Sequence, residues 1–265
     1  MNIIVCIKQV PDTTNVKIDP KTNTLIREGV KSIVNPFDEN AIEEAVRLKE
    51  AHGGKVTVIT MGPPQAAEAL KSAIAMGADE GILISDRAFA GADTWATSYT
   101  LSQAIKKIGT FDLVLFGKQA IDGDTAQVGP GVAEFLDIPQ ITFAIKIDIV
   151  GADGNQPSAR VKRQLEESAE IAETKLPAAV TVIKQINEPR MPSLKGQMRA
   201  KKAEIQTWTA ETIMAEPENI GLKGSPTQVV RIFTPPPRGN SEMLEGTIEE
   251  ISIKLFNKLK EQKII

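Results

Sequence analysis

Residues 56–85 read VTVITMGPPQAAEALKSAIAMGADEGILIS, a pattern of strand, helix and strand in direct succession. The apolar run 56–61 predicts a buried strand that a Gly-Pro-Pro break ends, and apolar residues then recur at helical spacing over 65–76. Gly77 predicts the end of that helix, and 81–85 predicts the next strand. A strand, a helix and a strand within about thirty residues are typical of a parallel βαβ unit.

The same alternation continues on both sides of this unit. We expect a first strand at 3–7, a hairpin or excursion at 16–26, and a helix that Asn35 caps and Gly53 ends. The remaining expected elements are a helix at 93–108, a strand at 113–116, a helix at 125–136 and a strand at 141–149. Strands that alternate with helices of this length predict an α/β fold of three layers, in which helices cover both faces of a parallel sheet.

The last third of the chain has a different pattern. From Asn187 onward, prolines and other breakers leave little room for regular elements until a final helix, in which Ile248, Ile251, Leu255 and Leu259 share one face. We therefore expect an α/β domain at 1–186 and an extended C-terminal arm at 187–265 that ends in a helix. Such an arm buries too little apolar surface by itself, so we expect it to lie on the sheet domain or on another subunit. A flexible tail is the alternative.

Composition excludes several classes of function. The 31 basic and 34 acidic residues give a net charge of −3, which disfavours nucleic acid as a partner. One cysteine and one histidine exclude disulfide frameworks, thiolate zinc cages and paired-histidine metal sites. The apolar run near the start is far shorter than the roughly 20 residues that cross a bilayer, and Asn2 follows Met1 without a basic segment, so we expect a cytoplasmic protein without membrane insertion. With so few catalytic groups, redox or group-transfer chemistry would need a bound cofactor.

Ligands of parallel sheets collect where loops leave the carboxyl ends of the strands. In the loop after the third strand, Arg87 suits a phosphate and Phe89 suits an aromatic ring. The following Gly91-Ala92-Asp93-Thr94 brings backbone close to a ligand and opens a helix, where hydroxyls of Thr94 and Thr97 suit a diphosphate. Simple helix capping by Asp93 and Thr94 is the alternative.

The loop after the fourth strand repeats this arrangement. Asp122 and Asp124 suit a ribose hydroxyl or an adenine amine, and residues 125–129 predict a second helix start. Two such loops on one sheet edge predict a nucleotide that carries a diphosphate.

Several longer motifs resemble one family. They are Cys6-Ile7-Lys8-Gln9-Val10-Pro11-Asp12, Asn35-Pro36-Phe37-Asp38, Ala75-Met76-Gly77-Ala78-Asp79, Gly117-Lys118-Gln119-Ala120-Ile121-Asp122 and Asn187-Glu188-Pro189-Arg190 through Lys201-Lys202. Nearly end to end and in order, they look like the beta subunit of electron transfer flavoproteins. Residues 85–94 and 123–130 resemble the branch of that family that bifurcates electrons.

The resemblance implies an adenine-nucleotide-binding sheet of the Rossmann-like, HUP type and a larger alpha subunit that carries its own FAD. In the bifurcating branch a second FAD binds here and accepts hydride from NADH; in the other branch AMP is a structural ligand. Electrons would pass to ferredoxin or flavodoxin and, through the alpha subunit, to an acyl-CoA or lactate type of dehydrogenase. The arm would wrap the partner subunit, with Leu194 in the loop that docks on the dehydrogenase.

Carried over residue by residue, the resemblance implies two groups of cofactor contacts. The pyrophosphate and the flavin end would meet Arg87, Phe89, Gly91, Ala92, Asp93 and Thr94. The AMP half would be surrounded by Cys6, Asn35, Asp38, Met61, Asp122, Gly123, Asp124, Thr125, Ala126, Gln127, Val128 and Gly129. No side chain needs to act as acid, base or nucleophile. A signalling module of the same sheet type, in which a bound adenine nucleotide regulates a partner and no electrons move, is the alternative function.

Overall fold

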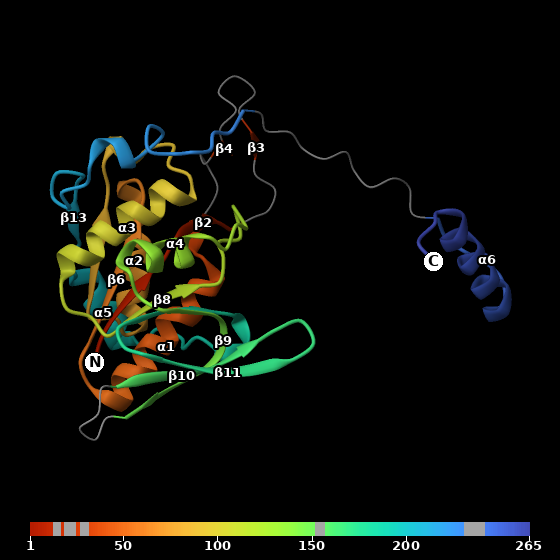
Figure 1. Cartoon of the computed structure of the whole chain (residues 1–265), viewed down its shortest axis with the longest axis horizontal. Helices are drawn as coiled ribbons and strands as arrows, with labels where there is room; N and C mark the ends of the chain where they lie inside the picture. Colours follow the sequence, from red (N-terminus) through yellow and green to blue (C-terminus); the bar gives the residue numbers. More distant parts are fainter. Residues whose placement is uncertain (13–16, 19–24, 27–31, 152–156, 231–241) are drawn as a thin grey trace. The chain divides into compact units, whose positions relative to one another are not determined.

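The structure is a computed structural model of the whole chain, and it describes all residues except 13–16, 19–24, 27–31, 152–156 and 231–241. Its centre is a nine-stranded sheet of strand order β11-β10-β9-β12-β8-β1-β6-β7-β13 (Figure 1). Seven strands run parallel, from β9 through β13, and β10 pairs antiparallel with both β9 and β11. The strands are β1 Asn2–Cys6, β6 Lys55–Met61, β7 Glu80–Ile84, β8 Leu113–Gly117, β9 Gln140–Val150, β10 Ser158–Gln164, β11 Ala169–Lys175, β12 Ala178–Val182 and β13 Gln206–Trp208.

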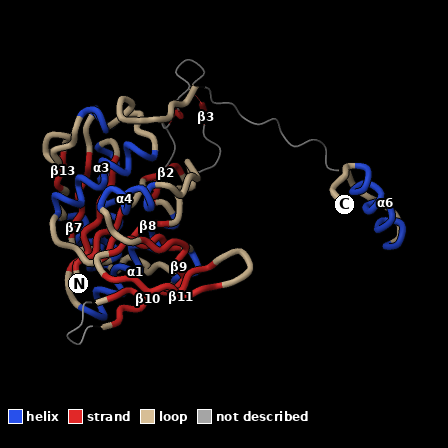
Figure 2. The backbone as a smooth tube through the Cα atoms, in the orientation of Figure 1, coloured by secondary structure: helices blue, strands red, loops and turns tan. Residues whose placement is uncertain are grey.

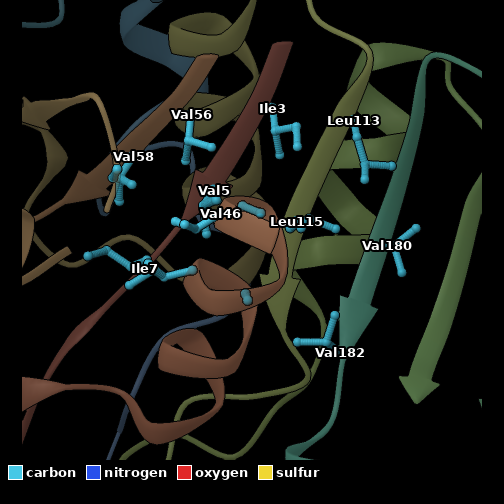
Figure 3. Packing of buried hydrophobic residues seen from close by; sticks show 14 of the residues in the cluster. Ile3, Val5, Ile7, Val46, Val56, Val58, Leu113, Leu115, Val180 and Val182 are labelled. Carbon is cyan, nitrogen blue, oxygen red and sulfur yellow. The ribbon is translucent and has the colours of Figure 1, made fainter. Parts of the chain in front are cut away.

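Both faces of the central strands are buried, which confirms the predicted three layers. Ile3 and Val5 of β1 belong to one hydrophobic cluster, whereas Ile4 and Cys6 belong to the other. Figure 3 shows the first cluster, in which alternate residues of β1, β6, β8 and β12 surround Val46. Because side chains alternate along a strand, a strand that is buried on both faces must be apolar at nearly every position, and this is why the runs in the sequence are continuous.

The helices follow the predicted pattern with two corrections. They are α1 Pro36–His52, α2 Ala67–Met76, α3 Thr94–Ile108 and α4 Val128–Leu136 (Figure 2). The helix expected from residue 125 begins at Val128, because Asp124 and Ala126 each have a φ of 55°, which a right-handed helix excludes. Asn35 precedes α1, but its side chain makes no capping hydrogen bond.

A hairpin at 16–26 is confirmed in its described part, since β3 Lys17–Ile18 pairs antiparallel with β4 Leu25–Ile26. Its turn, at residues 19–24, lies outside the described residues. Another short antiparallel pair joins β2 Gln9–Pro11 and β5 Ser32–Val34.

The sequence analysis did not predict β10, β11 or β12, so the sheet is mixed at one edge instead of wholly parallel. In β10, buried Ala159 and Val161 alternate with charged residues. This period of two is typical of an antiparallel strand with one solvated face, which follows from its place near the edge.

Residues 187–229 contain more regular structure than predicted. The expectation that breakers leave little room for elements there is wrong, since α5 Leu194–Lys202 packs on α2 and β13 extends the sheet beside β7. The Arg199 guanidinium donates to the carbonyls of Ile74 and Ala78 at the end of α2, at 2.7 and 2.8 Å. Contacts group residues 1–229 into one compact unit and 230–265 into another, so the boundary predicted at 186/187 falls inside the first unit.

The second unit contains the expected terminal helix, α6 Ile248–Glu261. Thr247 and Glu250 form a reciprocal capping box at its start, and Glu249, Lys258 and Lys260 complement the helix dipole. Taken by itself, the helix leaves large apolar side chains such as Ile248 and Phe256 exposed. Among the described residues, each helix is too short or too polar to span a bilayer.

An ion-pair cluster holds the start of residues 187–229 on α1. Arg190 donates to Glu43 at 2.7 Å and to Glu50 at 2.6 Å, and the Glu43 side chain is only 7% exposed. Asn40 Nδ2 also donates to the Asn187 carbonyl at 2.8 Å. Glu43 is therefore a nearly buried charge whose cation comes from a segment about 150 residues away.

We expect Arg190→Ala to lower the free energy of unfolding by about 2 kcal/mol, because Glu43 would be left buried without its cation. Chemical denaturation measures this loss. Arg160→Ala is the matched control, since Arg160 pairs with Glu173 in an exposed position, where ion pairs contribute little to stability. Equal effects of the two substitutions would contradict the role of Arg190.

Candidate functional site

Four loops share one edge of the sheet, and they include the two that the sequence predicted to meet there. They follow β1, β6, β7 and β8, which run parallel, so their carboxyl ends face the same way. Hydrogen bonds join neighbouring ends: Ile7 N donates to the Ile59 carbonyl at 2.9 Å, and Gly62 N donates to the Ile84 carbonyl at 3.0 Å. This carboxyl edge is the candidate site.

Asp38, in the first turn of α1, joins the loop after β1 to the end of β8. One carboxylate oxygen accepts Lys8 N at 2.7 Å, and the other accepts Gly117 N at 3.2 Å. The residue is 5% exposed. Burial raises the pKa of Asp38 to about 7, although hydrogen bonds from Asn35, Lys8 and Gly117 oppose the rise. Asp38 therefore fixes the spacing of two loops at the site, at the cost of a desolvated carboxyl group.

Asn35 makes a second connection between the same segments. Its Nδ2 donates to the Gln119 carbonyl at 2.9 Å, and its Oδ1 accepts Ile121 N at 3.1 Å. The side chain is fully buried. These bonds explain why Asn35 does not cap α1. The nucleotide contact that the family resemblance implies for Asn35 and Asp38 stays a prediction.

Gly117 is required by this packing. A Cβ on Gly117 would lie 2.2 Å from Asp38 Oδ1 and 2.6 Å from the Phe37 carbonyl carbon. Any larger residue would separate the end of β8 from the start of α1, so the close approach depends on glycine.

Asp38 and Asn35, together with Gly117, form the frame of the site. The β8–α4 loop, residues 118–127, extends from this frame, and some of its polar side chains are hydrogen-bonded to other side chains. Asp122 accepts from Lys8 Nζ at 2.6 Å, and Asp124 accepts from the Gln119 amide. Residues 121–125 and Gln127 are exposed, whereas Gly129 is buried beneath Thr181. The predicted site residues Asp122, Gly123, Asp124, Thr125, Ala126, Gln127, Val128 and Gly129 thus form one loop and the start of α4, which begins later than expected.

In the loop after β7, the side chains of Arg87 and Phe89 lie in different surroundings. Arg87 is exposed, and its guanidinium has no bonding partner among the described residues. Phe89 is 5% exposed and packs in the hydrophobic cluster beneath α3. Its ring is therefore a core side chain in this structure, and the predicted contact with a ligand ring is not what this packing favours.

The start of α3 is closed by protein groups. Asp93 accepts the backbone N–H groups of Trp95 and Ala96 at 2.9 and 3.1 Å, and its other oxygen accepts Thr227 N and Oγ1 at 3.0 and 2.7 Å. Capping, the alternative given for Asp93, is therefore present. The structure adds Thr227, a residue that sequence patterns could not associate with Asp93 because 134 positions separate them.

The remaining predicted residues occupy the same edge. Met61 and Cys6 end β6 and β1, and Thr94 and Thr97 lie in the first turns of α3. Gly91, with a φ of 76°, and Ala92 lead into that helix. Cys6 is buried, and burial followed by the Asp38 charge raises the pKa of its thiol well above the usual value. A buried neutral thiol is a packing residue, not a nucleophile.

A cavity of about 320 Å³ lies at the opposite, amino-terminal edge, lined by Asn2, Lys55, Glu80, Lys107, Trp208 and neighbouring residues. None of the predicted cofactor contacts lines it. The candidate site is instead an open edge built from loops.

Leu194, the predicted docking residue, is the first residue of α5 and is 81% exposed. Met191 and Met198 beside it are 89% and 62% exposed. Three large apolar side chains within eight positions make a small exposed apolar patch, which is typical of a protein contact.

Comparisons with known proteins agree with this arrangement. The model of the electron transfer flavoprotein domain matches residues 22–213. Over the full length of both chains, the protein is 53% identical to the electron transfer flavoprotein subunit beta of Thermoanaerobacterium thermosaccharolyticum and 52% identical to CarD, a subunit of the caffeyl-CoA reductase–Etf complex of Acetobacterium woodii. It is 45% identical to protein FixA of Sinorhizobium fredii, over 98% of this chain and 92% of that protein.

Identity above half over whole chains accompanies the mostly parallel, nucleotide-binding type of sheet that the family resemblance implied. The chain therefore belongs to the electron transfer flavoprotein family, as a beta subunit that functions in electron transfer.

Proposed function

We propose that this beta subunit binds FAD at the carboxyl edge and belongs to the bifurcating branch of the family. When bound there, FAD would supply the two-electron chemistry that accepts hydride from NADH and divides the electrons between ferredoxin or flavodoxin and the FAD of the alpha subunit. An acyl-CoA or lactate type of dehydrogenase would be the final partner. The protein groups hold and orient the cofactor and need not exchange protons with it.

The observation that carries the proposal is the frame that Asp38 and Asn35 build around the β8–α4 loop. It presents an exposed loop with two residues in the left-handed region, Asp124 and Ala126, each at a φ of 55°. Such backbone costs of the order of 1 kcal/mol per residue and is commonly kept at binding sites. A relative that is 52% identical is by its name a subunit of a reductase–Etf complex, which supports a second redox partner.

The residues at the edge fit FAD in part. The exposed Arg87 guanidinium is free for a phosphate, and the exposed β8–α4 loop is free for the ribose and adenine. The N–H groups of Trp95 and Ala96 are already bonded to Asp93, so the start of α3 offers fewer donors to a diphosphate than the sequence predicted. We therefore assign the pyrophosphate chiefly to Arg87 and to backbone near Gly91.

AMP as a structural ligand, the non-bifurcating alternative, would also use the β8–α4 loop but would offer Arg87 a single phosphate instead of a pyrophosphate. FixA proteins are also among the relatives, so the family contains several electron-transfer systems. Family membership sets aside the alternative of a signalling module that moves no electrons.

We expect the complex with the alpha subunit to release two FAD molecules per heterodimer on denaturation, because both subunits would bind the dinucleotide. Mass spectrometry of the released nucleotides measures this. One FAD and one AMP would place the protein in the AMP branch, and absence of flavin would end the proposal.

We expect Arg87→Ala to reduce the FAD retained after gel filtration, since the pyrophosphate would lose its cation. Because Arg87 has no partner among the described residues, its removal should change the free energy of unfolding by less than about 0.5 kcal/mol. Arg47→Ala, which removes an exposed arginine from the middle of α1, is the control and should retain the flavin. Full retention in both variants would exclude the role of Arg87.

Asp38 gives a pH dependence of defined sign. Its pKa is about 7 in the folded chain and about 4 when unfolded, so the folded state binds the proton more tightly. Its stabilising contribution is therefore greatest below about pH 4 and is lost as the pH rises to about 7. Relative to Asp38→Asn, which cannot ionise, the wild type should lose free energy of unfolding between pH 4 and 8. Denaturation of both forms across this range measures the difference, and a constant or rising difference would contradict the burial of this carboxyl group.

A further inference from the structure

Strand β9 has a bulge at Phe143, close to the candidate site. Phe143 has a φ of 62°, a conformation that a bulky residue other than glycine rarely adopts. The pairing register shifts on both sides of β9, between Val180 and Val182 of β12 and between Lys162 and Arg163 of β10. A bulge with this effect inserts one extra residue and redirects a side chain.

The redirected side chain is that of Phe143. In a regular strand Phe143 would share a face with Ile141, two positions earlier. Instead Ala144 joins Ile141 in the cluster against α1, and Phe143 belongs to neither buried cluster. The side chain is half-buried. The bulge thus withdraws an aromatic ring from the core.

Neighbouring side chains hold the bulge in place. Phe143 N donates to Thr181 Oγ1 at 3.2 Å, outside the ordinary strand ladder. Arg163 donates to the Thr142 carbonyl at 3.1 Å and to Thr142 Oγ1 at 2.9 Å. A strained backbone conformation that several hydrogen bonds hold in place indicates that the Phe143 ring has a function.

The ring lies beside the candidate site. Lys118 Nζ, at the start of the β8–α4 loop, is 5.3 Å from the centroid of the Phe143 ring. Thr181, which accepts from Phe143, also contacts the start of α4, where a Cβ on Gly129 would come within 2.7 Å of its methyl group. Phe143 therefore lies next to both ends of the loop that frames the site.

We propose that Phe143 is a further nucleotide-binding residue, whose ring contacts the flat heterocycle of the anionic nucleotide held by the β8–α4 loop. A half-buried aromatic ring beside an ammonium group recognises a molecule that has both a planar ring and a negative charge. Lys118 supplies the positive charge. This inference rests on the proposed function, because it assumes that the carboxyl edge binds a nucleotide.

Titration of the nucleotide-free complex with FAD, and separately with AMP, tests the inference. Phe143→Gly should weaken binding of the nucleotide by about tenfold, the usual effect of losing one stacking ring. Phe143→Tyr keeps the ring and should bind within about threefold of the wild type. The nucleotide-free Phe143→Gly complex should still fold, as thermal melting checks, because relief of the strained φ offsets part of the lost ring burial.

Asp137→Gly is the matched control. Asp137 also has a positive φ, 53°, but it lies at the far end of α4. Its substitution should leave nucleotide binding unchanged. If Phe143→Gly fails to fold, Phe143→Leu replaces it, with weaker binding supporting the proposal.

The outcomes separate the two proposals. Unchanged binding in Phe143→Gly or Phe143→Leu, with a wild type that binds, would overturn the role of Phe143 and leave the proposed function intact. A wild-type complex that binds neither FAD nor AMP would overturn the proposed function and this inference with it.

Discussion

The carboxylate of Asp38 is the interaction on which the candidate site depends. It accepts the backbone N–H groups of Lys8 and Gly117 from a buried position at the start of α1. An unpaired N–H group buried there would cost about 1–3 kcal/mol, so the carboxylate stabilises both loops together. The missing Cβ of Gly117 lets α1 approach, and Asn35 extends the connection to the β8–α4 loop. The spacing of the loops is thus set by protein groups before any ligand binds.

The other side of the site is stabilised by a segment from far along the chain. Asp93 caps α3 and accepts from Thr227, while Asp93 N donates to Ser225 Oγ and Leu222 N donates to the Ala90 carbonyl. A Cβ on Gly221 would lie 2.1 Å from the Ala88 carbonyl oxygen, so the two backbones are in close contact. Residues 221–227 therefore cannot shift without exposing the start of α3. The loop after β7 and the segment just before the second unit behave as one structure.

The sequence predicted those features that repeat at short range. Continuous apolar runs and helical spacing located β1, β6, β7, β8 and the helices between them, and strand direction placed the loops after β7 and β8 on one edge. The bonds of Asn35 to Gln119 and of Lys8 to Asp122 were not predictable, because more than 80 positions separate each pair. Phe89 shows a different limit: an aromatic residue in a short loop suggested a ligand contact, whereas the structure buries its ring in the core, and the ligand contact stays a prediction. A sequence can indicate that an aromatic residue lies in a loop, but it does not indicate whether the ring points into the core or toward a ligand.

The frame of the candidate site and the groups proposed to contact the ligand are chemically separate. Among the described residues, every buried side-chain nitrogen and oxygen has a hydrogen-bond partner, and Asn35 and Asp38 find theirs among backbone groups. The groups that we propose for ligand contact are exposed, namely Arg87 and the β8–α4 loop, together with the half-buried ring of Phe143. Substitutions among these exposed groups leave the frame unchanged, because they break none of its bonds. On the proposed function, the choice between FAD and AMP would therefore be made by these few groups and not by the frame.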